Sequence, residues 1–184
     1  MLTNFYTYIL FYILIICSTM GYGQAICLLS NKFKISNNLG YVGLIGVFFL
    51  IVYSYVSNIF ISHGLIHNSL IIIFGLIFFL IYCFFKDKQK NAWVYFFLIF
   101  LILIISVFLF KTHDDFPYYH FAYSYYLTQN SSLVGIGQFN LGYRTPSSIF
   151  YLNSLFYLPV IKYFMFHMPA VLIMGFSNLI LLIR

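Results

Sequence analysis

The chain has 184 residues, of which 63% are hydrophobic, 23% aromatic and only 7% charged. This composition leaves too little polar surface to cover a water-soluble globule, so it predicts an integral membrane protein. The net charge of +6 does not indicate a nucleic-acid partner, because the nine Lys and Arg residues are scattered between apolar runs and form no basic patch. We therefore expect one all-α, polytopic domain over residues 1–184, with membrane lipid as a partner.

Six apolar runs predict six transmembrane helices, because about 20 helical residues cross a bilayer. The runs cover residues 5–29, 39–61, 70–85, 92–110, 149–166 and 168–183. The first run is predicted to be a retained span, since Met1–Asn4 lacks the basic residue of a signal peptide. A long polar stretch, residues 111–148, separates the fourth run from the fifth.

Two smaller features of these spans leave alternatives open. Gly40, Gly43 and Gly46 lie three apart in the second run. They either allow close helix packing or reflect the ordinary glycine frequency of membrane helices. His63 and His67 have the spacing of two metal ligands on one helical face, but the intervening Gly64 and the short connection argue against a helix there.

Lysines predict the topology of the chain. Five lysines lie in the connections 30–38 and 86–90, whereas the connection 62–69 contains no Lys or Arg. The positive-inside rule places the two lysine-rich connections in the cytoplasm. The polar stretch 111–148 is then an outer loop.

The last two predicted spans fit this topology less well. Lys162 and His167 lie near their connection, which we expect to be a cytoplasmic turn. Arg184 then ends the chain on the outer side, which the positive-inside rule disfavours. Because the chain stops at the end of a span, we also expect it to be an N-terminal fragment of a longer protein.

Residues 116–129 within the outer loop predict a short helix. His120, Ser124 and Thr128 are four apart and would form one polar stripe among aromatic side chains. Such an aromatic helix beside a span is expected to lie along the membrane interface. Asp115 precedes it in the position of an N-cap.

Asp114 and Asp115 are two of the three acidic residues in the chain, and they are adjacent. At a membrane surface, Asp115 is predicted to act as a general base or first metal ligand, Asp114 as second ligand, and His120 as ligand or proton carrier. Their oxygen ligands suit a divalent metal, Mg²⁺ or Mn²⁺. In the alternative interpretation, Asp115 only caps the helix and Asp114 only faces water.

A glycine-rich segment, residues 135–148, returns the chain to the membrane. Its backbone amides and Arg144 are candidates for binding a phosphate, the arginine by a bidentate pair of hydrogen bonds. Lys111 is a second candidate for the same phosphate. Alternatively, the segment is only a series of turns, and Arg144 reaches toward the membrane surface.

Residues 111–160 carry motifs that resemble a group of bacterial multi-span proteins assigned to the integral-membrane glycosyltransferases of the GT-C type. The motifs are Asp115-x-x-x-Tyr119-His120, Gly135-x-Gly137-Gln138, and Gly142-x-Arg144 leading into Ser147-Ser148. The resemblance implies that the loop acid is a base or metal ligand in the transfer of a sugar from a polyprenyl-phosphate donor. It also implies a bacterial inner membrane, with the loop on the periplasmic face.

Two other classes of function compete with this prediction. A transporter-like or non-catalytic membrane protein remains an alternative, although no predicted span contains a carboxylate or a central charge of the kind a coupled pump uses. A lipid-linked glycan polymerase or ligase is the closer rival, since such enzymes also act through outer-loop Arg and His residues.

Overall fold

The computed structural model describes residues 2–29, 38–85, 90–108, 114–132, 134–144 and 147–183. The α-helices are α1 (Leu2–Leu29), α2 (Leu39–Phe60), α3 (Leu65–Phe85), α4 (Lys90–Phe108), α5 (Phe121–Gln129), α6 (Ser148–Leu155) and α7 (Met168–Leu182). A π-helix, η2 (Phe116–His120), and three 3₁₀ turns, η3 (Ile136–Gln138), η4 (Leu141–Tyr143) and η5 (Tyr163–Met165), complete the elements. The described ranges contain no β-strand, which confirms the all-α prediction.

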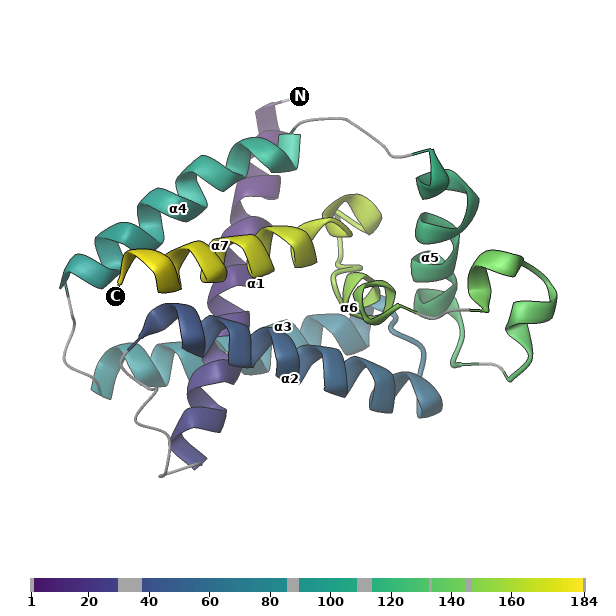
Figure 1. Ribbon diagram of the computed structural model, residues 1–184, viewed down its shortest axis with the longest axis horizontal. Helices are drawn as coiled ribbons and strands as arrows, with labels where there is room; N and C mark the ends of the chain where they lie inside the picture. The colour runs from purple at the N-terminus through teal and green to yellow at the C-terminus, as the bar shows by residue number, and fades with distance from the viewer. Residues whose placement is uncertain are drawn as a thin grey trace.

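The long helices form one bundle. Helix α1 packs on α2 and α3, while α7 packs on α2 and α4. Figure 1 shows that α2 and α4 begin at the end of the bundle where α3 and α7 finish. Helix α5 and the segment after it lie at the opposite end, which we call the α5 end.

Four segments are long and apolar enough to cross a membrane: Phe5–Leu29, Leu39–Phe60, Asn91–Phe108 and Tyr163–Leu182. Helix α3 contributes a shorter apolar stretch, Leu65–Ile81. It begins at Leu65 rather than at the predicted residue 70, so the connection after α2 is correspondingly short. The chain is therefore an integral, multi-pass membrane protein, and the structure does not confirm six spans.

The predicted fifth span, 149–166, is not one continuous helix. Helix α6 has eight residues and ends at Leu155, which corresponds to about 12 Å of rise against a hydrocarbon core of about 30 Å. The chain then reverses in a tight turn in which Leu158 and Lys162 bond backbone to backbone and Val160 and Lys162 have positive φ. The apolar side chains of this segment are buried in protein: Leu152, Leu155, Phe156, Leu158 and Ile161 are almost fully covered.

This correction changes the expected position of Lys162. The rings of Tyr163 and Phe166 pack against Phe121 of α5, with centroid separations of 5.1 and 6.1 Å. The turn that contains Lys162 therefore lies at the α5 end, not at the opposite face as predicted. Helix α7 then runs back to the end of the bundle where α2 begins. Arg184 lies outside the described residues.

Glycines allow the helices to approach closely. A Cβ atom on Gly46 would overlap the backbone of Thr19 in α1, and one on Gly43 would overlap the Phe176 ring of α7. A Cβ atom on Gly40 would lie 2.7 Å from the backbone nitrogen of Ile180. The close-packing interpretation of the three glycines is therefore confirmed.

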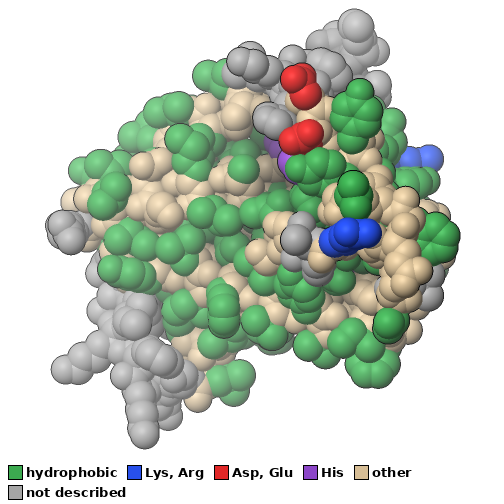
Figure 2. All heavy atoms as spheres, turned by 45° about the vertical axis from the view of Figure 1, so that its right-hand side comes forward, with side chains coloured by type: hydrophobic (Ala, Val, Ile, Leu, Met, Phe, Trp, Pro, Cys, Tyr) green, Lys and Arg blue, Asp and Glu red, His purple; other side chains and the backbone are tan. Residues whose placement is uncertain are grey.

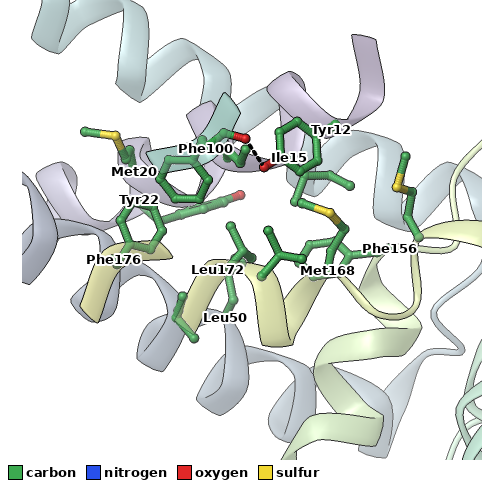
Figure 3. Packing of buried hydrophobic residues seen from close by; sticks show 14 of the residues in the cluster. Tyr12, Ile15, Met20, Tyr22, Leu50, Phe100, Phe156, Met168, Leu172 and Phe176 are labelled. Atoms are coloured by element: carbon green, nitrogen blue, oxygen red, sulfur yellow. Dashed lines mark hydrogen bonds between the residues drawn. The ribbon is translucent and has the colours of Figure 1, made fainter. Parts of the chain in front are cut away.

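Side chains from α1, α2, α4 and α7 converge in the core, as Figure 3 shows for Ile15, Leu50, Phe100 and Phe176. The Tyr12 hydroxyl donates to the carbonyl oxygen of Phe100 at 2.7 Å, which joins α1 to α4. A hydroxyl left without a partner in an apolar core is costly, so this bond also restricts how the two helices pack.

The α6 turn yields a prediction about topology. In a protein whose native cysteines are replaced, Val160→Cys and Tyr118→Cys should react with a membrane-impermeant maleimide from the same side, because both side chains are exposed and lie at the α5 end. Reporters fused after Lys88 and after Ile183 should both read the opposite side. Labelling of Val160→Cys only after permeabilisation would instead support a span at 149–166.

Candidate functional site

The acidic pair lies where the chain enters η2. Asp114 is exposed and Asp115 is half-buried. Asp115 occupies the N-cap position but has helical backbone angles, and its side chain makes no capping hydrogen bond. Its Oδ2 instead accepts a hydrogen bond from the Tyr119 hydroxyl at 3.3 Å. The capping interpretation of Asp115 is therefore wrong.

The predicted helix over residues 116–129 is present, but it has two parts. Its first five residues form a π-helix, in which the Phe121 amide donates to the Phe116 carbonyl. Short π-helical turns are frequent at functional sites. The predicted polar stripe is divided, because Ser124 and Thr128 are buried against the protein while His120 is half-buried.

Tyr119 joins the acidic turn to the glycine-rich segment. Its ring contacts the His120 ring edge-on, with centroids 4.3 Å apart. A Cβ atom on Gly142 would lie only 2.5 Å from Cγ of Tyr119, so η4 packs directly on this ring. The side chain of Asn140 also reaches the carbonyl oxygen of Tyr118, at 3.5 Å.

Arg144 directly follows η4 and is exposed. Its Nε donates to the carbonyl oxygen of Gly137 at 3.2 Å. That bond holds one edge of the guanidinium against the segment, while the two Nη groups carry the other four N–H donors. Figure 2 shows two acidic side chains, a histidine and a basic side chain on the same face of the molecule, with apolar side chains between them. Lys111 lies outside the described residues.

The electrostatics of Tyr119 favour its role as a donor. Partial burial, together with the charge of Asp115 and the hydrogen bond to it, raises the pKa of the Tyr119 phenol above its usual value. The phenol therefore keeps its proton at neutral pH. At neutral pH its O–H group can therefore donate to the Asp115 carboxylate and orient it.

The described residues form no group of three or more His, Cys, Asp or Glu side chains that could hold a metal. Asp114 and Asp115 nevertheless supply the hard oxygen donors that Mg²⁺ binds, usually with one or two carboxylates, water and substrate phosphate. The pair fits such a shared site better than a closed protein cage.

His120 also contacts the re-entrant part of the chain. Its ring lies 5.0 Å from the ring of Phe150 in α6. Tyr151, the next residue of α6, stacks on Tyr55 of α2 at 4.1 Å. Helix α6 therefore packs behind the acidic turn, between that turn and α2.

A polar cluster lies between α2, α3 and α6, and the sequence did not predict it. We call it the His63–Asn68 cluster; its members are Tyr53, Ser57, His63, His67, Asn68 and Ser154. The rings of His63 and His67 stack 5.2 Å apart. The signal was the density of polar side chains between residues 53 and 68 of an otherwise apolar chain.

A metal role for the two histidines is not supported. Each ring nitrogen already lies within hydrogen-bond distance of a protein side chain: Ser154 and Ser57 for His63, and Asn68 and Tyr53 for His67. The cluster is therefore a closed hydrogen-bond network.

No protein-family model, curated protein or solved structure matches the chain. The similarity to GT-C glycosyltransferases therefore stays a prediction made from the motifs.

The contact between Gly142 and Tyr119 can be tested directly. Gly142→Ala should separate η4 from η2, because the new methyl group would overlap the Tyr119 ring, and limited chymotrypsin cleavage in the segment 134–144 should accelerate. Gly64→Ala is the matched control, since a Cβ there meets only the Thr128 carbonyl oxygen at 3.9 Å. Equal cleavage of the two variants would contradict the close packing of η4 on Tyr119.

Proposed function

We propose that this protein is a membrane transferase of the GT-C type, which moves a sugar from a polyprenyl-phosphate donor to an acceptor hydroxyl. One observation supports this proposal most. Tyr119 binds Asp115 through its hydroxyl and packs against Gly142 through its ring. The motif parts that are separated in sequence, Asp115-x-x-x-Tyr119-His120 and Gly142-x-Arg144, are thus joined through one side chain.

The proposed roles follow from the chemistry of each group. The Asp115 carboxylate accepts the proton of the acceptor hydroxyl, and the hydroxyl oxygen forms a bond to the anomeric carbon of the sugar. The bond from that carbon to the phosphate oxygen breaks, and the electron pair leaves with the polyprenyl phosphate. Arg144 pairs with this phosphate through its Nη donors, with Lys111 as a second cation. His120 carries protons beside the base.

A divalent cation, Mg²⁺ or Mn²⁺, would be held by Asp114 and Asp115 together with the donor phosphate. When bound, it neutralises the charge that develops on the leaving phosphate. The residues of the chain perform the remaining tasks of orientation and proton transfer.

The surroundings of the site are consistent with a lipid-linked donor. Tyr118, Phe139 and Leu141 are exposed beside the acidic and basic groups. We place this end of the bundle at the periplasmic face of a bacterial inner membrane, because the lysine-rich connections adjoin the helix ends on the opposite side.

Asp115→Asn tests the proposed base. The amide keeps the shape and an oxygen that accepts from Tyr119, so the unfolding free energy should change by no more than about 0.5 kcal/mol. Loss of the charge should lower transfer by roughly 10²–10⁴-fold. The assay follows a radiolabelled polyprenyl-phosphate sugar with the complete protein in liposomes. Turnover near that of the wild type would remove the catalytic role, and Asp114→Asn should give a smaller loss.

Arg144→Lys tests the proposed phosphate contact. Lysine keeps the charge but lacks the planar fork, so the KM for the donor should rise roughly tenfold to a hundredfold. Lys162→Arg is the control, since Lys162 is an exposed cation at the same end of the bundle and outside the site. An unchanged KM in Arg144→Lys would show that Arg144 does not hold the donor.

A further inference from the structure

Helix α6 ends inside the protein, where its last carbonyl groups cannot reach water. The final carbonyls of any helix lack partners within the helix, and leaving them bare in an apolar medium costs several kcal/mol each. Two of these carbonyls, those of Asn153 and Ser154, accept from the backbone amides of Phe156 and Tyr157. The fully buried Asn68 adds side-chain donors. Its Nδ2 lies 2.8 Å from the Ser154 carbonyl oxygen, 3.0 Å from that of Tyr157 and 2.7 Å from that of His63.

The hydrogen bonds of the His63–Asn68 cluster indicate which ring nitrogen of each histidine carries a proton. The Ser154 hydroxyl donates to the Tyr151 carbonyl, so it accepts from Nδ1–H of His63 at 2.6 Å. Nε2 of His63 is then unprotonated and accepts from the Ser57 hydroxyl at 2.9 Å. Burial, and secondarily the proximity of His67, lowers the pKa of His63 to about 3, which agrees with a neutral ring.

His67 follows the same logic. The Oδ1 atom of Asn68 can only accept, so Nδ1 of His67, 2.9 Å away, is the protonated nitrogen. Its Nε2 accepts from the Tyr53 hydroxyl at 2.9 Å. Asn68 is therefore fixed by hydrogen bonds at both ends of its amide.

The position of α6 matters because α6 contacts the proposed site. Phe150 packs on His120, and the hydroxyl oxygens of Tyr151 and Tyr123 lie 3.3 Å apart. A shift of α6 would therefore move the ring that supports His120, one residue from Tyr119.

We infer that Asn68 is a positioning residue, which holds the end of α6 and through Phe150 sets the orientation of His120 in the site. The inference deepens the proposed function and rests on it for the catalytic consequence. Its structural part, the attachment of α6 by Asn68, stands independently of any activity.

Amide hydrogen exchange of the complete protein in detergent tests the structural part. Asn68→Leu keeps the size of the side chain but removes its donors, so exchange across residues 148–157 should accelerate roughly tenfold or more. Asn58→Leu is the matched control. Asn58 is equally buried, but its Nδ2 donates to the carbonyls of Leu127 and Asn130. It reaches α6 only through Ser132 and the Tyr151 hydroxyl, so exchange should change mainly at residues 127–132 and far less in α6.

Kinetics test the catalytic part. In Asn68→Leu, kcat for sugar transfer should fall by more than the KM for the donor rises. Helix α6 contacts the His120 ring through Phe150, whereas the Arg144 side chain is held by the Gly137 carbonyl. A general loss of folding would lower the amount of active protein and alter exchange throughout the bundle. If Asn68→Leu does not fold, Asn68→Ser should still accelerate exchange in α6, since one short hydroxyl cannot replace the amide that bonds to the carbonyls of Ser154, Tyr157 and His63.

These experiments distinguish failure of the inference about Asn68 from failure of the proposed sugar-transfer function. Unchanged exchange in α6 of a folded Asn68→Leu protein, or of Asn68→Ser where Asn68→Leu does not fold, would overturn the inference whatever the activity. Absence of transfer by the wild-type protein would remove the proposed function and leave the exchange result to decide the attachment of α6. Accelerated exchange with unchanged kcat would show that Asn68 holds α6 without positioning the site.

Discussion

The need to satisfy backbone carbonyl groups in an apolar medium shapes the α5 end of this protein. Helix α6 stops after eight residues, and its last carbonyls are buried. A helix can end at that depth only where protein groups replace water. The Asn68 amide does so together with the backbone amides of Phe156 and Tyr157, and the tight turn that follows returns the chain to α7 on the same side. The break in the apolar run 149–166 and the direction of α7 both follow from this one local arrangement.

The proposed site packs against the same helix, α6. Phe150 and Tyr151 of α6 support His120 and the interior face of α5, while Tyr119 connects the acidic turn to η4. Tight packing of aromatic rings transmits the position of one element to the next, since interiors have few voids in which a ring can relax. A site formed by short turns thus acquires a defined geometry from the transmembrane helices beneath it.

Hydrophobicity predicted the long helices well and α6 poorly. An apolar run reports that side chains avoid water, but it does not distinguish lipid from protein as the apolar surroundings. Leu152, Phe156 and Leu158 are as apolar as the residues of a span, yet they are buried in protein. For the candidate site, spacing predicted that Asp115 and His120 lie on neighbouring turns, and the structure shows Asp115 bonded to Tyr119, the residue before His120. Spacing within one segment carries no information on contacts with another, so the packing of Gly142 on Tyr119 and the link from Asn68 to α6 required the three-dimensional fold.

Among the described residues, uncharged polar side chains lie inside the bundle, whereas the charged side chains of the proposed site lie at the α5 end. Inside the bundle several uncharged polar side chains bond to one another, as in the pairs His63–Ser154 and Tyr53–His67, whereas the Ser18 hydroxyl and the Gln24 amide nitrogen are buried without a partner. Charged groups stand at the α5 end, where Asp114 and Arg144 are exposed. Moving an unpaired charge into the apolar interior is costly, whereas a neutral hydrogen-bonded pair is tolerated there. The interior network is therefore suited to holding helices in place, and chemistry that develops charge, such as proton abstraction or the departure of a phosphate, belongs at the α5 end.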